Sequence, residues 1–192
     1  MDFRIFLGAI ATIIAIYSYI PYIRDIFKGK TKPHAFSWLV WGLITVIGFF
    51  AQVSDDGGAG AWATGYSAIV ALTIFILALF RGEKEITKSD WASLFSAFVA
   101  MGLWAITNTP LFSVILISLI DAFGFLPTFR KSYHKPYQET MQTYVLSSVK
   151  YAIAIIALSN YSIITVLYPA SLVLMNILFI SLLVVRRKVI AV

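Results

Sequence analysis

Long apolar stretches alternate with short polar loops along the whole chain. A helix that spans a membrane needs about 20 mostly apolar residues, and seven segments approach that length. We therefore expect an all-α protein, a bundle of seven transmembrane helices. The predicted spans are residues 3–23, 35–53, 61–80, 91–106, 111–129, 139–158 and 163–185.

The composition agrees with this pattern. Hydrophobic residues make up 60% of the 192 residues and charged residues only 12%, which leaves too little polar surface for a soluble domain. The chain contains no cysteine, so disulfides, thiolate metal sites and thiol nucleophiles are excluded. The sequence also has no pattern typical of a catalytic triad, a histidine metal cluster or a phosphate-binding glycine loop. We expect neither an enzyme nor a protein with a bound metal or cofactor.

The basic residues lie on one side of the predicted membrane. Lys and Arg are concentrated after the first, third, fifth and seventh spans, whereas the loops after the second, fourth and sixth spans contain neither. Short loops rich in Lys and Arg remain cytoplasmic. We therefore predict a plasma (inner) membrane protein with its N-terminus outside and its C-terminus in the cytoplasm. This topology explains the net charge of +6, and nucleic acid is not an expected partner.

Two segments far apart in the chain resemble each other. Residues 19–24 read Tyr-Ile-Pro-Tyr-Ile-Arg and residues 125–130 read Phe-Leu-Pro-Thr-Phe-Arg, and a basic loop ending in Lys-Pro follows each. A three-helix unit crosses the membrane an odd number of times, so a second copy keeps the orientation of the first only if one helix is inserted. We therefore predict repeats at residues 1–86 and 109–192, joined by a linker helix within residues 87–108. Parallel repeats enclose a solute site near the middle of the membrane.

This arrangement resembles the SWEET and PQ-loop superfamily. The resemblance covers the whole chain: three helices, a linker helix, three more helices, an outer N-terminus, and a proline near the inner end of the first helix of each copy. These prolines are Pro21 and Pro127, and Tyr22 and Thr128 stand where the family motif has Gln. The resemblance implies a transporter in which the first two helices of each copy line the route of the solute. Pro21 and Pro127 are then expected to be bending points near an inner gate.

Two ionisable residues are predicted to lie deep in the membrane, Asp121 in the fifth span and Lys150 in the sixth. Each costs about 2.5–3.5 kcal/mol at the centre of a spanning helix, so such residues usually face a cavity or a partner. We favour the interpretation that both contact a solute. Two alternatives stay open: a structural ion pair that joins the two spans, and a retinal protein with Lys150 as the Schiff base and Asp121 as its counter-ion.

Polar and aromatic residues recur at helical spacing around these charges. In the second span Trp41, Thr45 and Gln52 share one face. The corresponding face of the sixth span carries Tyr144 and Ser147. Aromatic faces with a few polar groups suit a flat or hydroxylated small molecule. The predicted substrate-binding residues are Asp121, Lys150, Trp41, Tyr144, Ser147, Thr45, Gln52 and Tyr19.

Two further residues are interpreted differently. His34 lies in a basic loop and is predicted to be solvated. Asn176 follows Pro169 in the seventh span. We predict that it caps a carbonyl that this proline leaves unpaired, and contact with the solute is the alternative.

Together these features predict a transporter that moves a small polar solute by alternating access through a cavity in the middle of the membrane. The solute is expected to be sugar-like, or nucleoside- or vitamin-like. The alternative is a receptor, sensor or assembly protein on the same scaffold, in which Asp121 and Lys150 form a structural ion pair. The expected partners are the solute and the lipid bilayer, and the formation of a homo-oligomer is left open.

Overall fold

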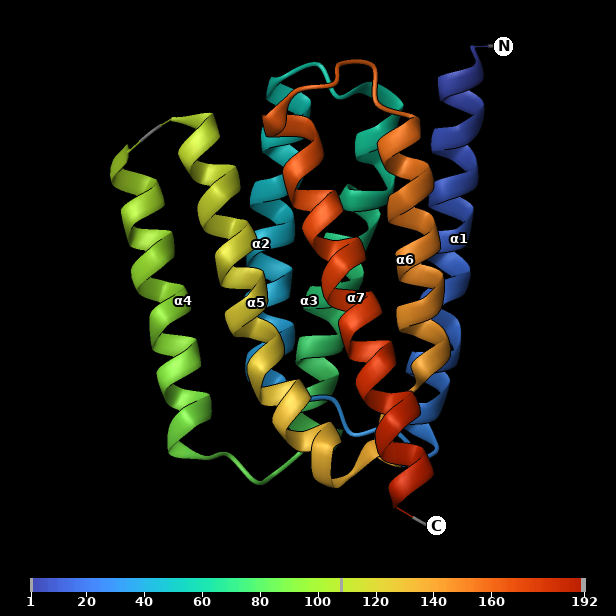
Figure 1. Cartoon of the computed structure of the whole chain (residues 1–192), viewed down its shortest axis with the longest axis vertical. Coiled ribbons are helices and arrows are strands. Elements are labelled where there is room, and N and C mark those ends of the chain that lie inside the picture. Colours follow the sequence, from blue (N-terminus) through green and yellow to red (C-terminus); the bar gives the residue numbers. More distant parts are fainter. Residues whose placement is uncertain (1, 108, 191–192) are drawn as a thin grey trace.

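The computed structural model describes residues 2–107 and 109–190. Within these residues the chain forms seven α-helices, which run side by side along one axis (Figure 1), and two short 3-10 helices. The predicted domain limits at residues 1, 108 and 192 fall outside the described residues. The elements are α1 Phe3–Phe27, α2 Ala35–Ser54, η1 Gly58–Ala61, α3 Trp62–Arg81, α4 Lys88–Thr107, α5 Pro110–His134, η2 Pro136–Gln138, α6 Met141–Ile156 and α7 Ile163–Val189.

Five helical segments are long and apolar enough to cross a membrane: α1, α2, α3 with the preceding η1, α5 and α7. The all-α prediction is therefore confirmed, and these helices indicate an integral membrane protein. α6 has 16 residues, whereas a spanning helix usually needs about 20. α4, as far as its residues are described, is also not among the helices that are long and apolar enough to cross a membrane. α1 begins and α7 ends at opposite ends of the bundle (Figure 1).

Two groups of three helices form the centre of the bundle. α3 packs along both α1 and α2, and α7 packs along both α5 and α6. The two groups meet where α1 packs against α6 and where α2 packs against α5. α4 packs mainly on α5, at the outside of the bundle (Figure 1). The middle of the molecule is therefore formed by six helices, and α4 is peripheral to it.

Several predicted span limits differ from the helices. α7 ends at Val189, beyond the predicted end at residue 185, and α4 begins at Lys88, before the predicted start at residue 91. α1 continues through Pro21 to Phe27, and α5 continues through Pro127 to His134, beyond the predicted ends at residues 23 and 129. A proline removes one backbone hydrogen bond, which a membrane helix tolerates when its surroundings support the neighbouring turns. The start of the sixth span is also wrong, because residues 136–138 form η2 and α6 begins only at Met141.

A close helix contact joins α2 to α7. A Cβ atom added at Gly48 would lie 2.4 Å from Cδ1 of Tyr168, so the ring occupies the space that a side chain would need. One turn earlier, the Thr45 hydroxyl shares a 2.8 Å hydrogen bond with the Tyr168 hydroxyl. Gly48 thus allows Tyr168 to reach Thr45, a residue of the cavity described next.

Candidate functional site

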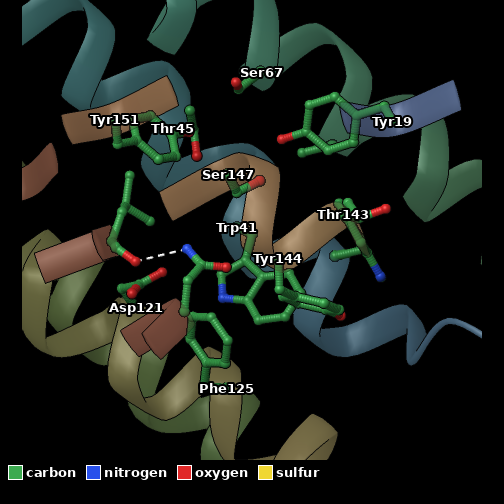
Figure 2. Close-up of a pocket in the computed structure, with 14 residues that line it drawn as sticks. Tyr19, Trp41, Thr45, Ser67, Asp121, Phe125, Thr143, Tyr144, Ser147 and Tyr151 are labelled. Atoms are coloured by element: carbon green, nitrogen blue, oxygen red, sulfur yellow. Dashed lines mark hydrogen bonds between the residues drawn. The ribbon is translucent and has the colours of Figure 1, made fainter. Parts of the chain in front are cut away.

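A cavity of about 50 Å³ lies in the middle of the bundle, between the two groups of helices (Figure 2). By the volume that one water needs, it is large enough for only a few water molecules. All six central helices contribute to its lining, and no described side chain of α4 does. The fourteen lining residues are Tyr19, Trp38, Trp41, Thr45, Ser67, Ala71, Asp121, Phe125, Thr143, Tyr144, Ser147, Tyr151, Leu172 and Asn176.

Most of the residues predicted to bind a solute come together at this cavity. Asp121, Trp41, Thr45, Tyr144, Ser147 and Tyr19 all line it. The structure places the other two elsewhere: Lys150 lies behind the lining, and Gln52 lies nearer the end of α2. Sequence reasoning also missed several lining residues, among them Trp38, Ser67 and Phe125.

Lys150 is completely buried and is held by hydroxyl groups and aromatic rings. Its Nζ donates to the hydroxyl of Tyr19 at 3.0 Å and to Oγ of Ser67 at 2.8 Å. The same nitrogen lies 4.4 Å from the centre of the Tyr19 ring and 4.6 Å from that of Tyr151. Cation–π contacts of this kind contribute about 0.5–2 kcal/mol each.

The structural ion pair between Asp121 and Lys150 is not formed. The ion pairs found in the described residues do not include either side chain. The reason is the order of the helices: α6 packs along α1, and α7 packs between α5 and α6. Lys150 therefore reaches toward α1 and α3, while Asp121 reaches the cavity from α5. Figure 2 shows Asp121 and Phe125 on one side of the cavity and Tyr19 and Ser67 on the other.

Asp121 is also completely buried, but it lacks a partner. Neither of its carboxylate oxygens accepts a hydrogen bond from any residue that the structure describes. Two hydrogen-bond donors of the lining, Nε1 of Trp41 and the hydroxyl of Thr143, are likewise unsatisfied within the described residues. Buried polar atoms in proteins are nearly always hydrogen-bonded, so a group of unsatisfied atoms around one cavity indicates a place for a ligand.

Gln52 and Asn176 have roles other than those predicted. The side-chain amide of Gln52 donates to the backbone carbonyl of Thr165 at 3.3 Å. Pro169 lies four residues further along α7 and has no N–H, so this carbonyl has no partner within the helix. Gln52 therefore satisfies the carbonyl that the proline leaves free, a role we had predicted for Asn176. Asn176 instead donates to the carbonyl of Leu172 at 2.6 Å and lines the cavity.

A buried network around Glu139 lies at the end of the cavity where α6 begins. Oε2 of Glu139 accepts hydrogen bonds from the hydroxyl of Tyr22 at 3.1 Å and from that of Tyr144 at 2.9 Å. Oε1 forms an ion pair with Lys131, which also donates to the carbonyl of Lys32 at 2.6 Å. Sequence reasoning treated Glu139 only as the start of a span. Glu139 is the only acidic residue after Asp121 in the sequence and closely follows the basic residues Arg130, Lys131 and Lys135, which is the signal that was available.

The residue after each predicted hinge proline contacts the opposite group of helices. Tyr22, after Pro21 on α1, reaches Glu139 just before α6. Thr128, after Pro127 on α5, donates to Oγ of Ser37 on α2 at 2.9 Å. Each proline is therefore followed by a side chain that ties its own helix to the other side of the cavity.

His34 is not solvated, contrary to the prediction. It is completely buried, and its Nε2 lies 3.4 Å from Oδ2 of Asp90. Burial lowers the pKa of His34 more than the neighbouring carboxylate raises it. Burial alone would raise the pKa of Asp90, but hydrogen bonds from Arg130 and Thr87 hold this pKa below its usual value. The contact joins the start of α2 to α4 and α5.

Comparison of the chain with protein families, curated proteins and solved structures found no match. The assignment of a function therefore rests on the geometry of the cavity and of the helices that enclose it.

Proposed function

We propose that this protein is a membrane transporter that moves a small polar solute, sugar-like or nucleoside- or vitamin-like, by alternating access. The observation that carries the proposal is the buried cavity between two groups of helices, with the unpartnered carboxylate of Asp121 in its wall. Intramembrane ionisable groups that face a cavity typically mark the path of a solute or ion.

The helix packing supports a repeated architecture like that of the SWEET and PQ-loop superfamily. In each group the third helix in chain order packs along the other two, and the groups meet through the first helix of one and the second helix of the other. Two parallel repeats related by an axis along the membrane normal have this pattern of contacts. In this arrangement α4 is the linker, and all seven helices cross the membrane.

The same geometry supports a gated cavity. A volume of about 50 Å³ is far below the roughly 300 Å³ or more of a typical ligand site. Helices must therefore move before a solute is admitted. We assign the inner gate to the hydrogen-bonded group of Tyr22, Tyr144, Glu139 and Lys131, because it closes the cavity at the end where α6 begins. Pro21 next to Tyr22 and Pro127 are the bending points.

The distribution of charge supports the proposed orientation. Basic residues occupy the last turns of α1, α3, α5 and α7, and these four helices end at the same end of the bundle (Figure 1). By the positive-inside rule that end is cytoplasmic. The N-terminus is then outside, and the C-terminus is inside a plasma (inner) membrane.

Uptake by purified protein in liposomes tests the proposal. We expect at least one labelled solute from a panel of sugars, nucleosides, vitamins and amines to accumulate, and we expect Asp121→Asn to abolish the uptake. Asp56→Asn is the matched control, since it makes the same chemical change in an exposed loop. Saturable binding of a solute without uptake would overturn transport and favour the receptor alternative.

A further inference from the structure

We propose that the solute carries a positive charge, a protonated or quaternary amine, and that Asp121 is its counter-ion in the cavity. The inference rests on the proposed function, because it names the class of solute for the same site. Three observations carry it: the charge of the lining, the aromatic rings beside that charge, and the unsatisfied donors nearby.

The described residues of the cavity wall include one carboxylic acid and no basic residue. This acid is Asp121, one of the fourteen described residues of the lining. The buried amine of Lys150 is directed to Tyr19 and Ser67 by hydrogen bonds of 3.0 and 2.8 Å. The protein thus supplies no described basic group that neutralises Asp121. A cationic solute would do so, whereas an anionic one would be repelled.

Aromatic rings lie beside this carboxylate. Phe125 follows Asp121 by one helical turn on α5, so the two side chains share a face. The Phe125 ring is 4.6 Å from that of Trp41, and Trp41 is 5.2 Å from Trp38. The faces of aromatic rings attract ammonium groups, and a set of such rings is the usual way in which proteins recognise quaternary amines. A carboxylate next to these rings favours a cation over an uncharged sugar ring.

The unsatisfied donors add a second feature to the solute. Nε1 of Trp41 and the hydroxyl of Thr143 have no partner among the described residues, and both residues line the cavity. They are free to donate to an oxygen of the solute. The geometry therefore fits a small amine that also carries a hydroxyl or carbonyl oxygen.

Binding to the purified full-length protein tests this inference with pairs of probes that differ in charge. Choline is compared with dimethylbutanol, its uncharged carbon isostere, and phenethylamine with phenethyl alcohol. Isothermal titration and thermal shift are measured for the wild type, Asp121→Asn and the control Asp56→Asn. We expect at least one amine to bind about tenfold or more tightly than its uncharged partner. This preference disappears in Asp121→Asn and persists in Asp56→Asn.

Each other outcome contradicts the inference in a recognisable way. Equal binding of amine and alcohol, or no binding of either amine, overturns the inference. This comparison uses the wild type alone, so it remains valid even if Asp121→Asn does not fold. An amine preference that survives in Asp121→Asn overturns the role of Asp121. Uptake of an uncharged solute without amine binding would overturn the cation site and leave transport intact. Amine binding without uptake of any solute would overturn transport and leave the cation site intact.

Discussion

At the scale of single residues, Asp121 and Lys150 are two buried ionisable residues with different surroundings. Lys150 is compensated by two hydroxyl groups and two aromatic rings. Asp121 receives no hydrogen bond from the described residues, although leaving a buried polar group unpaired costs about 1–3 kcal/mol and more for a charge. Because the unpaired side chain of Asp121 lowers stability, we expect its role to be the binding of a ligand.

The change Asp121→Asn should therefore separate stability from function. Asn has the same shape and loses no hydrogen bond to the described protein, so the melting temperature should stay the same or rise. Uptake of the solute should fall at least about tenfold, the effect of losing roughly 1.4 kcal/mol of binding. Thermal unfolding and liposome uptake on the same preparation measure both effects. A large fall in melting temperature would show that Asp121 has a structural partner.

At the scale of the helices, the proposed inner gate consists of side chains that reach from one group of helices to the other. Tyr22 and Tyr144 both donate to Glu139, and Lys131 forms an ion pair with the same carboxylate. One carboxylate thus connects α1, α5 and α6. Since hydrogen bonds to a charged group contribute about 1.5–3 kcal/mol, removing this charge should favour separation of the helices at that end.

The change Glu139→Gln should make the cavity more accessible from the side where α6 begins. The chain has no cysteine, so a single Ser147→Cys reports on the cavity wall. We expect a membrane-impermeant maleimide added on that side to label this cysteine several-fold faster when Glu139→Gln is present. Glu85→Gln is the control, since Glu85 is exposed and pairs only with Lys135 at the surface. Equal labelling rates in the three proteins would contradict the gate.

The contact between α2 and α7 gives a second prediction at this scale. Gly48→Ala places a methyl group where the Tyr168 ring lies. The ring must move and its hydrogen bond to Thr45 is strained, so we expect destabilisation by about 1–3 kcal/mol. Gly102→Ala is the matched control, because a Cβ atom at Gly102 meets no atom within 4 Å. Thermal unfolding should show a lower melting temperature for Gly48→Ala only, and equal values would contradict the close contact.

At the scale of the whole molecule, a charged cluster ties the peripheral α4 to the rest. Asp90 of α4 accepts hydrogen bonds from Nε and Nη2 of Arg130 on α5, at 3.1 and 2.8 Å. His34, at the start of α2, lies against the same carboxylate. The cluster thus joins three helices at the end of the bundle where the basic residues lie, and it is the most extensive polar contact that α4 makes in the described structure.

This cluster should make stability depend on pH. Burial lowers the pKa of His34 below its ordinary value of 6.5, so below that value the unfolded chain takes up a proton more readily than the folded protein. Stability should therefore fall as the pH is lowered from about 7 to about 5. His34→Asn should reduce this dependence, whereas His134→Asn, a change at the exposed histidine, should not. Melting temperatures across this range measure the effect, and identical pH profiles for all three proteins would contradict it.

The hydrophobic pattern predicts the order and type of the helices well, because each helix is a continuous apolar segment. The spacing also predicts correctly that Trp41, Thr45 and Ser147 lie on helix faces directed to the cavity. Spacing does not determine which neighbouring helix a face contacts, because that depends on the order of the helices in the bundle. For this reason Lys150 contacts Tyr19 and not Asp121. The burial of His34 and Glu139, which lie just before α2 and α6, could not be predicted, because burial of a residue outside a regular helix depends on tertiary packing.

The hydrogen bond from Gln52 to the carbonyl of Thr165 crosses from one group of helices to the other, where α2 ends and α7 begins. If the groups separate at that end, the carbonyl loses its donor, and the proline at position 169 prevents the helix from supplying another. Water must then take the place of the amide as the helices part. In the proposed transport cycle, opening on this side therefore requires water to enter between α2 and α7, and its rate should respond to osmotic stress.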